Sequence, residues 1–161
     1  MTSADYLIWF DEVVAPTEPM IRLVEPGFID WKPTERSFAI GQLISHIPQA
    51  LHFNAGVLQE KKGLPSLRGI LTANRHQPSA TVEESVALLR DGIRVFKEAV
   101  RTLEDRQFQT KVISTPQKGD ITVCRFCLFV VEHHIHHLME LHLSLKILGF
   151  PVDTRSLYTG S

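Results

Sequence analysis

The chain has 161 residues, of which 43% are hydrophobic and 22% are charged, and its formal net charge is −1. This composition is close to that of an average soluble protein, so it excludes a disordered, fibrous or low-complexity chain, and the length predicts a single domain over residues 1–161. The near-neutral charge gives no basic patch for nucleic acid, so we expect no nucleic-acid partner. Histidine stands out: five of the eight histidines lie between positions 133 and 142.

No membrane or secretory segment is predicted. No run of residues approaches the about 18 consecutive apolar residues that a membrane-spanning helix needs. The chain begins Met-Thr-Ser-Ala-Asp, without the basic and apolar regions of a secretory signal. Its two cysteines are too few for a disulfide framework, which agrees with a reducing compartment. We therefore expect a cytoplasmic protein with no membrane partner.

Turn-forming residues divide the chain into four apolar blocks. The first covers residues 3–24 and contains Pro16 and Pro19, so we expect a kinked helix or two helical pieces, followed by a loop over residues 25–36. The second opens at Ser37, a plausible N-cap, and continues to residue 60. Its apolar residues repeat at intervals of three and four, which predicts one stripe of an amphipathic helix.

A long connection over residues 61–79 precedes the third block. Thr81 is followed three residues later by Glu84, as a capping box requires, and the helical period continues to residue 103. This pattern predicts a third long helix.

The fourth block has the clearest end signal. After a loop at residues 115–119, we expect Asp120 to cap a helix that runs to Leu148, since Gly149 suits the left-handed position after a helix. Residues 150–161 show no pattern and are expected to form a surface tail. No segment alternates convincingly with period two, so strands are not expected. The sequence therefore predicts an all-α fold, a four-helix bundle with at least one long crossover connection.

Two histidines of the fourth helix have the spacing of a metal-binding pair. His133 and His137 are four residues apart, so their rings project side by side. The apolar stripe of this helix is centred nearer His134, which leaves His134 with His137 as an alternative pair. The competing interpretation is that these are core histidines with satisfied hydrogen bonds.

A metal site of this kind needs a third ligand from another helix. His46 is the best candidate, because it lies beside the apolar stripe of the second helix. His52 is rotated away from that position, and His76 lies in the long connection. Imidazole ligands suit zinc, nickel, copper and iron, so the residues alone do not name the metal.

Cys124 and Cys127 match C-x-x-C. A redox interpretation expects this motif near a βαβ unit, which is absent from the predicted elements. We therefore expect the two thiols to pack in the core.

Several short motifs occur in a characteristic order: Trp31-Lys-Pro33 and Arg36-Ser37 before His46, then Lys118-Gly-Asp120, then His-x-x-His-His from His133, and finally Leu148-Gly149. In order and spacing they resemble the DinB/YfiT-like family over nearly the whole chain. The resemblance implies a four-helix bundle in which one histidine of helix two and a His-x-x-x-His pair of helix four bind a divalent metal, zinc or nickel being favoured. Those roles fall on His46, His133 and His137.

The chain departs from the family after the last histidine. Many members continue with Arg-Gly-Gln, whereas His137 is followed by Leu138-Met-Glu140. Glu140 lies seven residues after His133 on the same helix face, so it is a candidate acceptor for a ring N–H. The alternative is a solvated carboxylate or a partner for a nearby lysine.

The resemblance implies two possible functions. One is a metal-dependent enzyme, a thiol S-transferase or a hydrolase, that acts on a small thiol or another small molecule; no catalytic acid or base is identified. The other is a non-catalytic bundle for stress response or interaction, with the metal structural or absent. Relatives often form homodimers, and Leu143 and Ile147 lie outside the main apolar stripe, so we also expect a homodimer.

Overall fold

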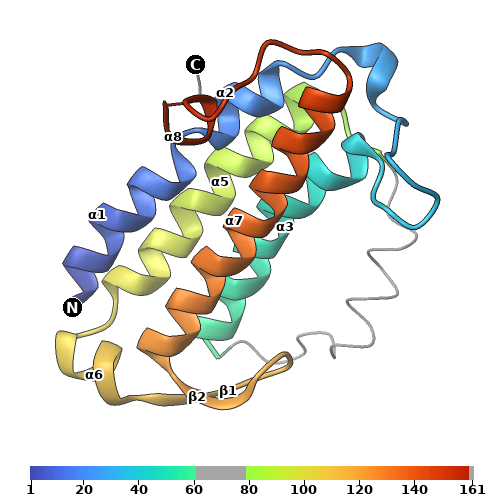
Figure 1. Ribbon diagram of the computed structural model, residues 1–161. Coiled ribbons are helices and arrows are strands. Elements are labelled where there is room, and N and C mark those ends of the chain that lie inside the picture. The colour runs from blue at the N-terminus through green and yellow to red at the C-terminus, as the bar shows by residue number, and fades with distance from the viewer. Residues whose placement is uncertain (61–78, 160–161) are drawn as a thin grey trace.

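The computed structural model describes residues 1–60 and 79–159. Figure 1 shows the long helices side by side, with a small hairpin at one end of the bundle. In chain order the elements are α1 (Ser3–Val14), α2 (Thr17–Arg22), the 3₁₀ turn η1 (Pro26–Phe28), α3 (Ile40–Leu58), α5 (Val82–Arg101), α6 (Asp105–Thr110), β1 (Val112–Thr115), β2 (Gly119–Thr122), α7 (Val123–Ile147) and α8 (Ser156–Thr159). The predicted all-α bundle is confirmed. In the described ranges, no helix is both long enough and apolar enough to cross a bilayer.

A cluster of buried aromatic rings joins the first helix to the rest of the bundle. The Phe10 and Phe96 rings, from α1 and α5, have centroids 5.0 Å apart, and Tyr6 packs 5.6 Å from Phe108. All four side chains are fully buried. Burying a side chain of this size contributes about 1.5–3 kcal/mol to stability. Tyr6 also donates a hydrogen bond to the carbonyl oxygen of Cys127, at 2.9 Å, which places that cysteine in the core as expected.

The start of α3 differs from its prediction. The N-cap is Ala39 rather than Ser37, whose hydroxyl instead bonds to Thr34. The first amides of the helix are satisfied by loop carbonyls, since the Ile40 N–H donates to Trp31 and the Gly41 N–H donates to Ile29. A helix whose first N–H groups are hydrogen bonded to carbonyls of a neighbouring loop does not depend on a capping side chain.

The capping box of α5 and the break in the first block are both confirmed. The Thr81 hydroxyl accepts from the Glu84 amide at 3.2 Å, and the Glu84 carboxylate accepts from the Thr81 amide at 2.9 Å. The first block forms two helices, α1 and α2, that are separated near Pro16.

The expectation of no strands is wrong. β1 and β2 form an antiparallel hairpin in which Thr115 pairs with Gly119, and Gly119 adopts a positive φ of 69° that suits glycine. Asp120 therefore lies in β2, and Thr122 caps α7 by accepting from the amide of Arg125. Each strand has only four residues, too few for a convincing alternation.

The end of α7 is confirmed, and residues 150–159 beyond it are ordered. Gly149 has a φ of 84°, its N–H donates to Lys146, and the Phe150 N–H donates to Leu145, the two bonds of a Schellman motif. Beyond it, α8 forms a helical turn, and His142 Nε2 donates to the Asp153 carbonyl at 2.9 Å. This bond ties the tail to α7.

Candidate metal centre

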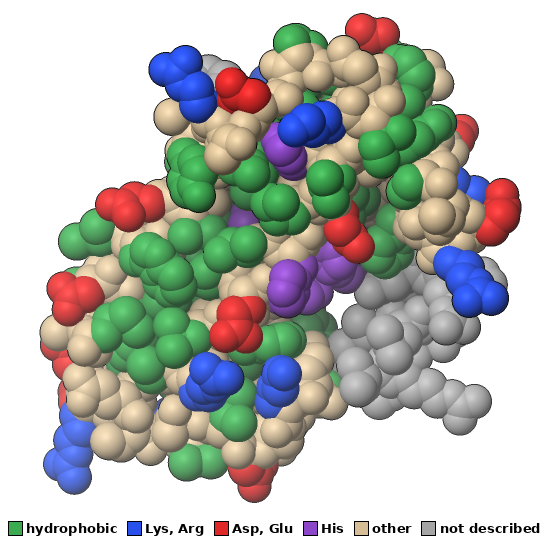
Figure 2. Space-filling view, in the orientation of Figure 1, with side chains coloured by type: hydrophobic (Ala, Val, Ile, Leu, Met, Phe, Trp, Pro, Cys, Tyr) green, Lys and Arg blue, Asp and Glu red, His purple; other side chains and the backbone are tan. Residues whose placement is uncertain are grey.

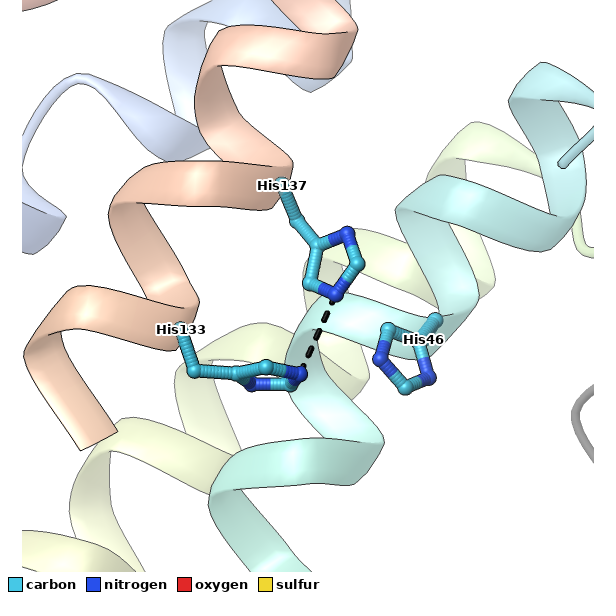
Figure 3. Close-up of side chains that lie close together, drawn as sticks. All are labelled: His46, His133 and His137. Carbon is cyan, nitrogen blue, oxygen red and sulfur yellow. Dashed lines mark hydrogen bonds between the residues drawn. The ribbon is translucent and has the colours of Figure 1, made fainter. Parts of the chain in front are cut away.

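Three histidine rings from two helices meet beside the α3–α7 contact. His46 comes from α3, and His133 and His137 come from adjacent turns of α7 (Figure 3). Each ring offers a nitrogen, and these three atoms lie within 4.8 Å of one another. No other set of three or more metal-ligating side chains comes together in residues 1–60 and 79–159.

Helix periodicity explains how these rings meet. His133 and His137 share one face of α7, and their Nε2 atoms are 3.1 Å apart. His46 lies between the buried residues Ser45 and Ile47 and is itself buried, with 7% of its surface exposed. Its ring centroid lies 4.6 Å from that of His137 and 5.4 Å from that of His133. The site therefore has a buried side on α3 and a more open side on α7.

The spacing of His133 and His137 fits two ligands of one divalent ion. Two nitrogens that bind one zinc ion at about 2.0–2.1 Å lie about 3.4 Å apart in tetrahedral geometry. The separation of 3.1 Å between the Nε2 atoms of His133 and His137 is close to this value. Burial, reinforced by the neighbouring rings of His137 and His46, lowers the pKa of His133 to about 3. His133 is therefore neutral at pH 7, the form in which an imidazole binds a metal.

Glu140 contacts the ring of His137. Its Oε2 atom lies 2.6 Å from His137 Nδ1, and this hydrogen bond is the main cause that lowers the pKa of the Glu140 carboxyl. An ionised carboxylate only accepts hydrogen bonds, so His137 Nδ1 is the donor. The predicted ring acceptor is therefore present, and its partner is His137 rather than His133.

Two phenylalanines that the sequence analysis did not single out flank the rings. Phe38 stacks on His46 with centroids 5.3 Å apart, and Phe129 stacks on His133 at 6.0 Å. On Phe129, the Lys118 ammonium lies 5.0 Å from the ring centroid. Phe129 precedes His133 by four residues on the same helix. Because this spacing puts both side chains on one helix face, the contact could have been predicted from the sequence. Figure 2 shows histidine side chains at the surface of this region.

The alternative ligand His134 points elsewhere. It is buried, and its Nε2 atom is hydrogen bonded to the Thr17 hydroxyl of α2 at 2.8 Å. Burial lowers its pKa to about 4. His52 lies 3.4 Å from the Asp91 carboxylate and is not part of the group, and His76 is outside the described residues.

Comparisons with known proteins agree with this architecture. A family model for the DinB superfamily matches residues 10–141. The crystal structure of a DinB-like protein, YjoA, from Bacillus subtilis is similar with a TM-score of 0.67 and 17% identity, covering 90% of this chain and 92% of that chain. No curated protein matches the chain significantly. Because the family model spans most of the sequence, the chain belongs to the DinB superfamily.

Proposed function

We propose that His46, His133 and His137 bind one divalent metal ion and that the protein is a metal-dependent enzyme, a thiol S-transferase or a hydrolase. One observation carries the proposal: three imidazoles from two helices converge so that their nitrogens lie within 4.8 Å. An all-imidazole donor set suits several divalent metals, and zinc or nickel is the ion we propose.

The residues around the rings have complementary tasks in this proposal. The three imidazoles hold the ion, and the rings of Phe38 and Phe129 shield His46 and His133 from water. The side chain of His137 is 14% exposed, so we place the approach of a small molecule on the α7 side. When bound, the ion supplies Lewis-acid chemistry, because it lowers the pKa of a thiol or water and provides a nucleophile at neutral pH.

A substrate panel tests the enzymatic part of the proposal. Untagged protein loaded with zinc or nickel is incubated with cellular low-molecular-weight thiols and electrophilic acceptors, and separately with esters and amides. We expect product formation that requires the metal and is lost in His137→Ala. His136→Ala is the matched control, since His136 is exposed on the same helix. Turnover that survives chelation or His137→Ala would remove the proposed mechanism.

A non-catalytic bundle is the second candidate. The observation that favours it is the sequence Leu138-Met-Glu140 after His137, where many relatives carry Arg-Gly-Gln. In that case the metal is structural or absent, and none of the substrate panel would be converted; a structural ion would raise the melting temperature.

We also propose that the protein forms a homodimer through the exposed face of α7. Four large apolar side chains recur there at intervals of four residues: Ile135, Met139, Leu143 and Ile147. The last two are 52% and 65% exposed. Figure 2 shows apolar side chains gathered on the face that carries α7. An apolar stripe of this kind is typical of an interface.

Light scattering tests the dimer. We expect wild-type protein at micromolar concentration to have twice the chain mass, and the double variant Leu143→Glu, Ile147→Glu to be monomeric, because two buried charges without partners oppose association. Val112→Glu is the control, since Val112 is 58% exposed on β1, away from this stripe. A monomeric wild-type protein would contradict the proposal.

A further inference from the structure

We propose that Glu140 is a positioning residue for the candidate metal centre: it holds the His137 proton on Nδ1 and so presents the bare Nε2 nitrogen to the ion. This inference rests on the proposed function, because it concerns the same three-histidine site. It adds a fourth side chain that acts through His137 and does not itself bind the metal.

The geometry gives His137 one role at each nitrogen. Nδ1 lies 2.6 Å from Glu140 Oε2, a short hydrogen bond just below the about 2.7–2.9 Å of charge-assisted N–H···O⁻ bonds. Nε2 faces His133 Nε2 at 3.1 Å. A neutral imidazole carries one proton, so a proton held on Nδ1 leaves Nε2 as an acceptor, which takes a hydrogen bond from His133 here and can bind an ion in its place. Histidines that bind metals usually donate their other N–H in this way, which fixes the tautomer and the ring orientation.

Helix geometry keeps the pair together. Glu140 lies three residues after His137 on α7, so the two side chains are neighbours on one helix face. The carboxylate contacts the ring nitrogen remote from the nitrogen that faces His133, and Glu140 is not in the group whose ligand atoms converge. While it keeps this hydrogen bond, Glu140 fixes the orientation of the His137 ring and does not itself bind the metal.

The competing interpretation, a carboxylate that pairs with a nearby lysine, finds no support. Across the described residues, Glu140 hydrogen bonds to His137 and forms an ion pair with no lysine or arginine. A merely structural His–Glu pair at this spacing stabilises the helix slightly and leaves metal affinity unchanged. Metal affinity and the tautomer of His137 therefore separate a positioning role from a structural one.

Zinc affinity is the first measurement, made by competition with a chromophoric chelator on untagged protein. We expect Glu140→Leu to weaken zinc binding about 10- to 100-fold, the usual effect of losing the partner of a metal-bound histidine. The zinc affinity of Glu140→Gln should lie between those of the wild type and Glu140→Leu, since the glutamine amide oxygen still accepts the hydrogen bond but carries no charge. Glu132→Gln is the matched control, because Glu132 is an exposed carboxylate about two turns before Glu140 on α7 that pairs with Arg125.

The tautomer of His137 is the second measurement, made by nitrogen-15 NMR on metal-free protein at pH 8. We expect the proton on Nδ1 in the wild type and a shift toward Nε2–H in Glu140→Leu. Wild-type zinc affinity in Glu140→Leu, or an Nε2–H tautomer in the wild type, would overturn the inference. If the wild type binds no zinc, the proposed function fails, while the NMR result still decides whether Glu140 sets the tautomer.

Discussion

Replacing His137 by alanine is expected to weaken zinc binding at least about 100-fold, because the loss of a ligand exceeds the 10- to 100-fold effect of losing a ligand's hydrogen-bond partner. His137 is the ring closest to both other members of the group, with centroids 4.6 Å from His46 and 4.6 Å from His133. Its removal leaves two imidazoles, which make a weak site. The readouts are a competition titration with zinc and metal analysis of the purified protein.

Two further variants make this result specific. His136→Ala removes an exposed histidine from the same helix and should leave zinc affinity unchanged. His134→Ala should keep the metal but lower the free energy of unfolding, since it leaves the buried Thr17 hydroxyl without its partner, at a cost of about 1–3 kcal/mol. Wild-type zinc affinity in His137→Ala, or loss of zinc in His134→Ala, would contradict the assignment of ligands.

Metal-free protein is expected to lose about 2–3 kcal/mol of unfolding free energy for each pH unit between pH 6 and pH 5. The pKa of His133 is lowered to about 3 and that of His134 to about 4, against 6.5 for an unperturbed histidine. Between these values both rings stay neutral in the folded chain and become protonated on unfolding. Their contribution is therefore present above pH 6.5 and is lost as the pH falls toward 4.

Urea unfolding of chelator-treated protein at a series of pH values measures this slope. Ordinary carboxyl pKa values near 4 keep Asp and Glu ionised above pH 5, so the histidines dominate this window. His134→Gln should reduce the slope by about half, because each group contributes about 1.4 kcal/mol per pH unit. Equal stability at pH 7 and pH 5 would show that His133 and His134 are not buried as neutral rings.

The sequence predicted helix ends correctly where residues nearby in the sequence satisfy the backbone hydrogen bonds. The Thr81 capping box and the Gly149 helix end are short-range patterns, and both are present in the structure. The prediction failed where tertiary contacts decide the outcome. At the start of α3, carbonyls of Ile29 and Trp31 take the place of a Ser37 cap, and the β1–β2 hairpin is too short to show alternation.

At the candidate site too, local patterns predicted one part of the arrangement and tertiary contacts decided the rest. The apolar stripe of α7 is centred nearer His134, and that residue is the buried one, hydrogen bonded to α2. The converging rings of His133 and His137 lie on the flank that faces His46, a placement that depends on how α7 packs against α3. Periodicity therefore located the core side of α7, and the family resemblance was needed to choose between His133 and His134.

The central claim is that His46, His133 and His137 share one metal ion. Anomalous diffraction at the zinc edge, from crystals of untagged zinc-loaded protein, tests it most directly. We predict one peak per chain, about 2.0–2.1 Å from one ring nitrogen of each of the three histidines. Zinc-loaded crystals with no peak among these rings, or with the peak on other side chains, would contradict the claim.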